Sequence, residues 1–304
     1  MERSKKSTRL VLGPSRLLFF LMLSLFLNLS CVPNPEDITL SDNSDVQNSS
    51  PPSHSSYYIE EIMALTHNSK CSAYSWQDRG RAPAAYIQGM ALTFARSFCR
   101  LKTSQAAFIS IATVLSNNTG DAKIDALTYY SSLFSQSGMS LTNNRDETVR
   151  SLYTLGIGLG MRESSGKYCE GRDMSASNTS ASTAEAGIFQ TSYNSLSASE
   201  ELSKLYNEYK LAPHKCLLEV FSSNIKCKTS SIAGTGPGAD YQAFNKSCPA
   251  FATEYAMIML RVRRNHYGPI NRKEAQVVQS CNQMLNSVQD YIENDLNACD
   301  DLNL

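Results

Sequence analysis

Apolar side chains recur every three or four positions along most of the chain after Tyr57, the spacing typical of helices that bury one face. In the first such segment the apolar positions are Tyr86, Ile87, Met90, Phe94 and Phe98. The same pattern predicts helices that include residues 84–101, 108–115, 145–161, 251–266 and 278–292. No sustained alternation of apolar and polar residues occurs, so at most short strands are expected, within residues 169–185. The predicted fold is mainly α, a helical globule.

Turn and capping residues indicate where one further helix begins. The Asn-Asn-Thr-Gly sequence of residues 117–120 is a turn signal. Asp121 follows it and is expected to cap the helix. The inward face of that helix is predicted to contain Ile124, Leu127 and either Tyr130 or Leu133.

Three glycines, Gly156, Gly158 and Gly160, alternate with apolar residues in the predicted helix over residues 145–161. Each lowers helix propensity by roughly 1 kcal/mol relative to alanine, so local preference does not account for them. We therefore expect this helix to pack closely against a neighbouring helix at these positions.

The charges of the chain balance, with 28 basic and 28 acidic side chains among 304 residues. The length allows one or two globular domains. The balance argues against non-specific binding of nucleic acid or anionic lipid through bulk electrostatics. We expect a monomer that binds no nucleic acid.

The first thirty residues have the pattern of a secretory signal. Basic residues precede an apolar run from Leu17 to Leu29, which is shorter than the roughly 20 residues of a membrane-spanning helix. The sequence L-N-L-S-C, ending at Cys31, resembles the lipobox of bacterial lipoproteins, although Asn28 stands where that family usually has leucine. The resemblance implies a lipid on Cys31, and Val32 implies sorting to the outer membrane, facing the periplasm or the cell surface. Ordinary secretion is the alternative.

The segment after the lipobox is rich in Ser, Asn, Asp and Pro and has few large apolar side chains. Because such a composition cannot bury enough surface to fold, we interpret residues 31–56 as a flexible tether. The predicted organisation is a signal peptide over residues 1–30, this tether, and one globular domain over residues 57–304.

Nine cysteines are dispersed along the chain. If Cys31 carries the lipid, eight remain, enough for four disulfides in the oxidising compartment that a signal segment implies. Their connectivity stays open, because eight cysteines allow roughly 100 pairings. The chain has no C-x-x-C pair and no Cys/His cluster, so no metal or other cofactor is expected.

Glu163 is the main candidate for chemistry. It stands at the C-terminal end of the predicted helix, where the apolar segment gives way to small and polar residues. Buried surroundings and the helix carbonyls both disfavour an ionised carboxylate there. Its pKa is therefore expected to be raised, as a general acid near neutral pH requires. A surface glutamate in a helix-ending turn is the alternative.

Two short motifs resemble a known family. The R-E-S-S-G of residues 162–166 and the A-G-I-F-Q of residues 186–190 resemble the E-S and G-L-M-Q signatures of the goose-type lysozyme and soluble lytic transglycosylase superfamily. The resemblance implies a lysozyme-like helical fold without a cofactor. It also implies cleavage of the β-1,4 bond between N-acetylmuramic acid and N-acetylglucosamine, with the glycan strands of peptidoglycan as the partner.

The resemblance assigns roles to individual residues. Glu163 matches the catalytic acid of the superfamily, and Ser164 matches the serine beside it. Tyr193 is a candidate for a hydrogen bond to a sugar or to Glu163, with a packing role as the alternative. The residues that match the segment lining the substrate cleft are Gly187, Ile188, Phe189 and Gln190.

The position of a second carboxylate stays open. Goose-type lysozymes carry an aspartate just beyond the G-L-M-Q segment, where this chain has Thr191 and Ser192. Asp173 is the preferred candidate for the missing group, and Glu170 and Glu185 are the alternatives. A lytic transglycosylase needs no second carboxylate, because the 6-hydroxyl of muramic acid attacks within the substrate. The lack of an aspartate just beyond the G-L-M-Q segment therefore favours transglycosylation. It does not exclude hydrolysis, which in an inverting enzyme needs a base.

Three further features bear on the site. Arg79 and Arg81 are candidates to meet the carboxylates of peptidoglycan, or they lie on a solvated turn. His266 falls on the apolar stripe of its predicted helix and is interpreted as a packed histidine rather than a base. The turn over residues 265–271 is expected to face the site.

The alternative function is that of a non-catalytic peptidoglycan-binding or envelope-spacing lipoprotein.

Overall fold

The computed structural model describes residues 54–103, 109–172, 177, 179–227 and 232–302, which belong to one compact unit, Ser50–Leu304. The predicted signal peptide, Cys31 and the tether up to residue 53 lie outside the described residues. The domain boundary expected at Tyr57 falls within the first helix, which begins at His54. None of the described helices combines the length and the apolar composition that crossing a bilayer requires.

Helices dominate the described part of the chain, so the predicted fold class is confirmed. The longer helices are α1 (His54–His67), α2 (Ala84–Thr103), α3 (Ile109–Ser116), α4 (Ala126–Gln136), α5 (Arg145–Ser164), α6 (Glu200–Leu211), α8 (Pro237–Ser247), α9 (Pro249–Val262) and α11 (Gln279–Asn294). The shorter helical segments are η1 (Tyr193–Ala198), η2 (Pro213–Cys216), α7 (Leu218–Ser222), η3 (Arg264–His266), α10 (Gly268–Asn271) and α12 (Asn297–Leu302).

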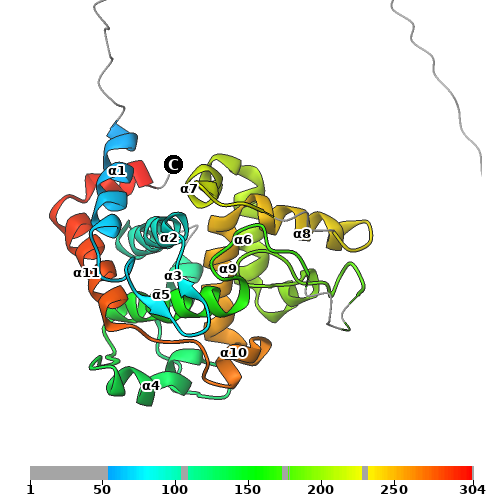
Figure 1. Cartoon of the computed structure of the whole chain (residues 1–304), viewed down its shortest axis with the longest axis horizontal. Helices are drawn as coiled ribbons and strands as arrows, with labels where there is room; N and C mark the ends of the chain where they lie inside the picture. The colour runs from blue at the N-terminus through cyan, green and yellow to red at the C-terminus, as the bar shows by residue number, and fades with distance from the viewer. Residues whose placement is uncertain (1–53, 104–108, 173–176, 178, 228–231, 303–304) are drawn as a thin grey trace, which may run out of the picture. The chain divides into compact units, whose positions relative to one another are not determined.

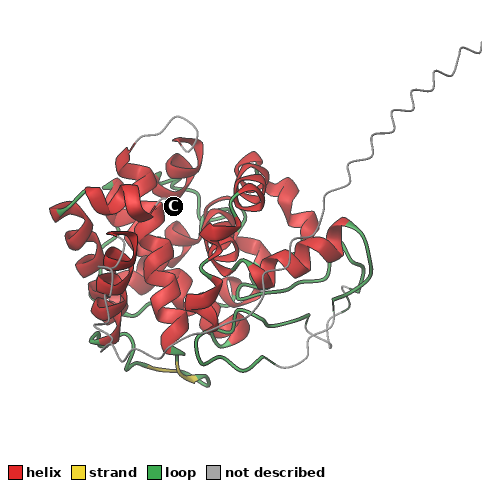
Figure 2. Ribbon diagram, turned by 90° about the horizontal axis from the view of Figure 1, so that it is seen from above, coloured by secondary structure: helices red, strands yellow, loops and turns green. Residues whose placement is uncertain are grey.

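Helix α2 lies at the centre of the fold, where it contacts helices from both ends of the domain. Its neighbours are α1, α3, α5, α7, α9, α11 and α12 (Figure 1). Helices α6 and α8 instead pack against α9. A view from above shows helices on both sides of this centre and the short strand pair at one edge (Figure 2). The apolar positions predicted for α2 are all fully buried, namely Tyr86, Ile87, Met90, Phe94 and Phe98.

The predicted start of α4 was wrong. Asp125 caps this helix, because its carboxylate accepts a hydrogen bond from the backbone N–H of Leu127. Asp121 instead accepts from the N–H of Lys123 in the preceding turn, at 2.8 Å. Ile124 therefore lies before the helix and is exposed, rather than on its inward face.

The short strands lie elsewhere than expected. Strand β1 (Ser75–Trp76) pairs antiparallel with β2 (Gly80–Arg81), whereas the described residues of 169–185 contain no strand. Asp78 and Gly80 make the hairpin turn possible, because they adopt φ values of 59° and 68° in the left-handed region that short turns require. No sustained strand pattern precedes this turn, so sequence alone gave little sign of the hairpin.

Four disulfides join the eight cysteines after Cys31, as the cysteine count predicted. The pairs are Cys71–Cys281, Cys99–Cys299, Cys169–Cys227 and Cys216–Cys248. The first two close long loops, with sequence separations of 210 and 200 residues. In the chain-entropy description, closing a loop of this size stabilises the folded state by roughly 5 kcal/mol.

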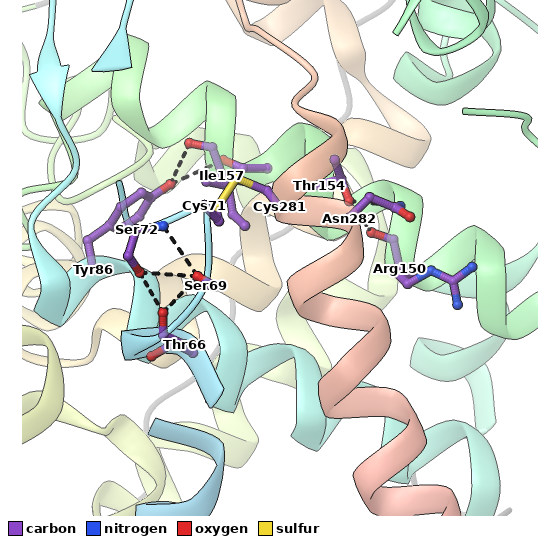
Figure 3. Close-up of a disulfide and its surroundings, with 11 residues drawn as sticks. Thr66, Ser69, Cys71, Ser72, Tyr86, Arg150, Thr154, Ile157, Cys281 and Asn282 are labelled. Atoms are coloured by element: carbon purple, nitrogen blue, oxygen red, sulfur yellow. Dashed lines mark hydrogen bonds between the residues drawn. A yellow bond between two sulfur atoms is a disulfide. The ribbon is translucent and has the colours of Figure 1, made fainter. Parts of the chain in front are cut away.

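Figure 3 shows the first of these disulfides and the contacts around it. Cys281 in α11 joins Cys71, which follows α1. Beside this bond, Tyr86 at the start of α2 donates its hydroxyl hydrogen to the carbonyl oxygen of Ile157 in α5, at 2.9 Å. The contacts around this disulfide thus join the N-terminal segment to α2, α5 and α11.

The glycines of α5 lie where other parts of the chain approach its backbone, and at Gly156 and Gly160 the neighbour is another helix, as predicted. A β-carbon at Gly160 would stand 2.3 Å from the Tyr86 hydroxyl, and one at Gly156 would stand 2.4 Å from the end of Met257. At Gly158 the neighbour is the backbone carbonyl oxygen of Gln276, at 2.1 Å. A larger side chain at Gly158 would push α5 away from the backbone of Gln276.

Gly158→Ala is therefore expected to destabilise the domain by roughly 1–3 kcal/mol, since the added methyl group meets backbone that cannot move aside. Gly156→Ala is the matched control on the same helix, because the methyl group there meets the flexible end of Met257. Urea unfolding of both variants measures the difference. Equal stability of the two variants would contradict the close approach at Gly158.

Candidate active site

Glu163 lies in the last turn of α5, just before the helix ends. Ser165 closes the helix with a left-handed φ of 55°, and Gly166 follows with a φ of 73°. The N–H of Gly166 donates to the carbonyl oxygen of Gly160 at 3.1 Å, which is the bonding of a Schellman cap. Glu163 is therefore attached to a helix end whose backbone is fixed.

A cavity of about 540 Å³ opens beside Glu163. Its walls come from three parts of the chain: the end of α5 with the β1–β2 turn, the loop between α5 and η1, and α10 with the segment after it. Charged side chains predominate among the lining residues, which are Arg79, Arg162, Glu163, Glu170, Gly171, Arg172, Glu185, Gln190, Pro269, Arg272 and Glu274.

Burial raises the pKa of Glu163 to about 8, and the negative charge of Glu185 acts in the same direction. Arg272 and Arg79 oppose this shift without cancelling it. No residue in the described part of the chain hydrogen-bonds the Glu163 carboxyl. At neutral pH the group thus keeps a proton that it can give to a ligand in the cavity.

Glu254 on α9 shows what a buried carboxylate looks like when it has a structural role. It is fully buried, and it accepts hydrogen bonds from Arg100 Nε at 3.1 Å and from the Tyr209 hydroxyl at 2.8 Å. Burial alone would raise its pKa, but Arg100 and Arg96 outweigh that effect and hold the pKa below its ordinary value. Glu163 has no such bonded arginine.

The predicted site-facing turn, residues 265–271, contributes one residue to the lining of the cavity. Pro269 lines the cavity, together with Arg272 just beyond the turn. Tyr267 stands behind them and is 1% exposed, and no described residue hydrogen-bonds its hydroxyl. Burial raises the pKa of Tyr267, and the charge of Glu163 adds to the effect. Tyr267 is thus a neutral hydroxyl within electrostatic reach of the acid.

Glu274 has a different role from Glu163 although both line the cavity. Arg272 donates to its two carboxylate oxygens at 2.8 and 3.0 Å, and Arg162 lies 3.3 Å away. The bonds from Arg272 hold the pKa of Glu274 below its usual value. Glu274 therefore stays ionised and orders two arginines of the wall. Sequence reasoning missed Arg162, Arg272 and Glu274 as cavity residues.

The A-G-I-F-Q segment divides between the cavity and the core. Gln190 lines the cavity and bonds through Nε2 to the carbonyl oxygen of Gly187, at 2.9 Å. The side chains of Ile188 and Phe189 are fully buried, so they support the wall from behind. Gly187 donates its N–H to the carbonyl oxygen of Glu170 at 2.9 Å, with a φ of 79° that favours glycine.

Ser164 and Tyr193 are not among the residues that line this cavity. Ser164 is buried and bonds back to the carbonyl oxygen of Gly160 at 3.1 Å, within its own helix. Tyr193 packs its ring against Tyr241, with centroids 6.1 Å apart. Asp173, the preferred second carboxylate, lies outside the described residues.

Three candidate side chains outside the two motifs line the cavity, namely Arg79 and the alternative second carboxylates Glu170 and Glu185. Arg79 also donates to the carbonyl oxygen of Arg162, at 2.8 Å. Arg81 is exposed on β2 and is not part of the lining. His266 ends η3, half-buried, and burial lowers its pKa. Because α9 ends at Val262, His266 does not lie on the apolar stripe of that helix, and this part of the prediction was wrong.

A second cavity of similar size lies between α1 and α11, with a volume of about 530 Å³. It brings together one carboxylate, Glu61, and one ammonium group, Lys70, among small polar and apolar side chains. This lining lacks the concentration of acids that surrounds Glu163. Across the part of the chain that the structure describes, no three His, Cys, Asp or Glu residues form a group that could hold a metal ion.

Family models, curated proteins and solved structures were compared with this chain, and none of them matches. The chemistry of the cavity is therefore the main basis for a function.

The raised pKa of Glu163 makes the stability of the domain depend on pH. In the unfolded chain Glu163 ionises near its ordinary pKa, whereas in the folded chain it keeps its proton up to about pH 8. The folded state therefore loses stability as the pH rises from about 4.5 through 8. Glu163→Gln is expected to be more stable than the wild type by roughly 2–4 kcal/mol at pH 9 and similar to it at pH 5.

Thermal unfolding across this pH range measures the effect. Glu219→Gln is the control, because Glu219 is exposed on α7 and outside the cavity. Stability curves of Glu163→Gln and the wild type that run parallel from pH 5 to 9 would contradict the raised pKa.

Proposed function

We propose that this chain cleaves the β-1,4 bond between N-acetylmuramic acid and N-acetylglucosamine in peptidoglycan, with Glu163 as the general acid. The activity is that of a lytic transglycosylase or of a goose-type-like muramidase on a lysozyme-like domain. One observation carries the proposal: a carboxylic acid with a pKa of about 8 stands on the wall of a charged, open cavity. A glycosidase acid needs this state, because it must donate a proton to the leaving oxygen.

The environment of Glu163 supports this role. The proton goes to the bridging oxygen while the C1–O4 bond breaks, and the carboxylate that remains is stabilised by Arg272 and Arg79. The polar wall suits a sugar, whose hydroxyls need hydrogen-bond partners. The guanidinium groups of Arg79 and Arg172 suit the lactyl and peptide carboxylates of peptidoglycan.

The proposal includes the location. A lipid on Cys31 and the tether over residues 31–56 would hold the domain at the outer membrane, within reach of the cell wall. The four disulfides support an oxidising compartment such as the periplasm.

A non-catalytic peptidoglycan-binding or envelope-spacing lipoprotein is the second candidate. The arginine-rich lining favours it, since such a wall would bind anionic glycan without cleaving it. The raised pKa of Glu163 weighs against it, because a binding site gains nothing from burying a carboxyl without a partner.

Glu163→Gln separates the two candidates. Glutamine keeps the shape of the side chain and has no transferable proton, so release of soluble muropeptides from purified sacculi is expected to fall by about 100-fold or more. Sacculus pull-down is expected to show unchanged binding, and Glu219→Gln should release muropeptides as the wild type does. Wild-type-like release by Glu163→Gln would refute the assignment of the acid.

The raised pKa of Glu163 predicts how the activity depends on pH. The protonated form of Glu163 is the active one, so the rate at low substrate concentration is expected to fall as the pH rises through about 8. Muropeptide release, measured between pH 5 and 10 at constant ionic strength, tests this. An alkaline limb with its midpoint below pH 6 would mean that burial does not hold the proton on Glu163.

A further inference from the structure

The disulfide Cys169–Cys227 differs from the other three described disulfides in its exposure to solvent. Cys227 is exposed and Cys169 is half-buried. The cysteines of the other disulfides are at most 6% exposed, namely Cys71, Cys99, Cys216, Cys248, Cys281 and Cys299. A dissolved thiol therefore reaches Cys169–Cys227 in the folded protein, whereas the three buried bonds are open to attack only after the domain opens around them. Exposed disulfides are also the ones that are reduced most readily.

The same disulfide holds one wall of the cavity beside Glu163. Cys169 directly precedes residues 170–172, all three of which line that cavity. These three residues belong to no helix or strand, so no regular ladder of backbone hydrogen bonds fixes them. The covalent bond to Cys227 therefore limits how far this wall can move away from Glu163.

The other end of the bond is attached to the core through α7. Phe221 of α7 is fully buried, and this helix packs against α2. Just after it the chain turns, with the N–H of Ile225 donating to the carbonyl oxygen of Ser222 at 3.0 Å. Cys227 follows this turn. The disulfide thus fastens an irregular wall of the cavity to a segment that the core holds in place.

The wall is also connected to the A-G-I-F-Q segment. The carbonyl oxygen of Glu170 accepts a hydrogen bond from the N–H of Gly187 at 2.9 Å, and Gln190 of the same segment lines the cavity. Movement of residues 170–172 away from the cavity would break this bond. Opening the disulfide would therefore affect two parts of the lining and not one.

The charge next to Cys227 favours attack at its sulfur. Lys226 directly precedes Cys227 and is exposed. The attacking species in thiol–disulfide exchange is a thiolate, which an ammonium group attracts. A small anionic thiol compound fits these surroundings.

We propose that Cys169–Cys227 is a thiol-exchange site that controls the cavity: a small anionic thiol compound opens this bond, the wall over residues 170–172 moves away, and peptidoglycan cleavage slows. For its effect on cleavage this proposal rests on the proposed function of Glu163. The thiol chemistry itself does not depend on that function.

The exchange proceeds in two steps. The thiolate of the small compound bonds to Sγ of Cys227, the Cys169–Cys227 bond breaks, and Cys169 leaves as a thiolate that takes a proton from solvent. A second thiolate then attacks the sulfur of the small compound in this mixed disulfide, so Cys227 leaves and is protonated in turn. Two small thiols are oxidised to one disulfide for each protein disulfide that is reduced.

Thiol mapping of the wild-type protein is the first test. The protein is equilibrated with reduced and oxidised glutathione at graded ratios, alkylated with iodoacetamide and analysed by mass spectrometry. Cys169 and Cys227 are expected to be alkylated while the six buried cysteines remain disulfide-bonded. In hydrogen–deuterium exchange, the amide of Gly187 is expected to exchange at least about tenfold faster in the reduced protein, because its bond to Glu170 is lost.

Muropeptide release from purified sacculi is the second test. Reduction by glutathione is expected to lower release by about tenfold or more, and oxidised glutathione is expected to restore it. The double variant Cys169→Ser/Cys227→Ser keeps the other three disulfides and is the matched control. It is expected to release muropeptides as slowly as the reduced wild type and to be unaffected by glutathione. Circular dichroism verifies that it is folded.

Alkylation of any buried pair before Cys169 and Cys227 would overturn the proposal, and so would unchanged exchange at Gly187 in the reduced protein. Release by the reduced wild type within about threefold of the oxidised form would also overturn it. If the oxidised wild type releases no muropeptides, the proposed function fails instead. The alkylation pattern and the exchange at Gly187 then still decide whether the disulfide controls the wall.

Discussion

The close approach of α5 to its neighbours is the constraint on which the rest of the fold depends. Glycine at positions 156, 158 and 160 lets the backbone of this helix contact Met257, Gln276 and Tyr86 directly. The helix is therefore wedged between the first and last parts of the domain, and its C-terminal turn cannot shift independently of them. Because Glu163 occupies that turn, the position of the acid follows from the packing of the whole core.

Two carboxylic acids show how one fold uses burial in opposite ways. Glu254 is surrounded by bonded donors and serves to join α2, α6 and α9. Glu163 is withdrawn from water with no donor bonded to it, and a second acid nearby disfavours its ionisation further. The arrangement around Glu254 stabilises the domain. The arrangement around Glu163 reduces the stability of the domain at neutral pH and gives it a proton that it can transfer.

The periodicity of apolar residues predicted the helices whose buried face repeats over several turns. The bounds of α2, α5 and α11 agree with it closely, and so does the need for small residues in α5. Short segments such as α7, α10 and the hairpin gave no such signal. The start of α4 was misplaced because Asp121 and Asp125 are equally good caps locally, and only the tertiary partner of Asp125, Arg261 at 2.7 Å, distinguishes them.

Sequence also identified the candidate acid, because its position at a helix end is a local property. It did not identify Arg272 and Glu274 as cavity residues, since packing between distant segments brings them beside Glu163. The two long disulfides add a topological property to this packing. A single cut of the main chain between residues 99 and 281 would leave the two pieces joined by both Cys71–Cys281 and Cys99–Cys299. A nicked molecule would remain one covalent body.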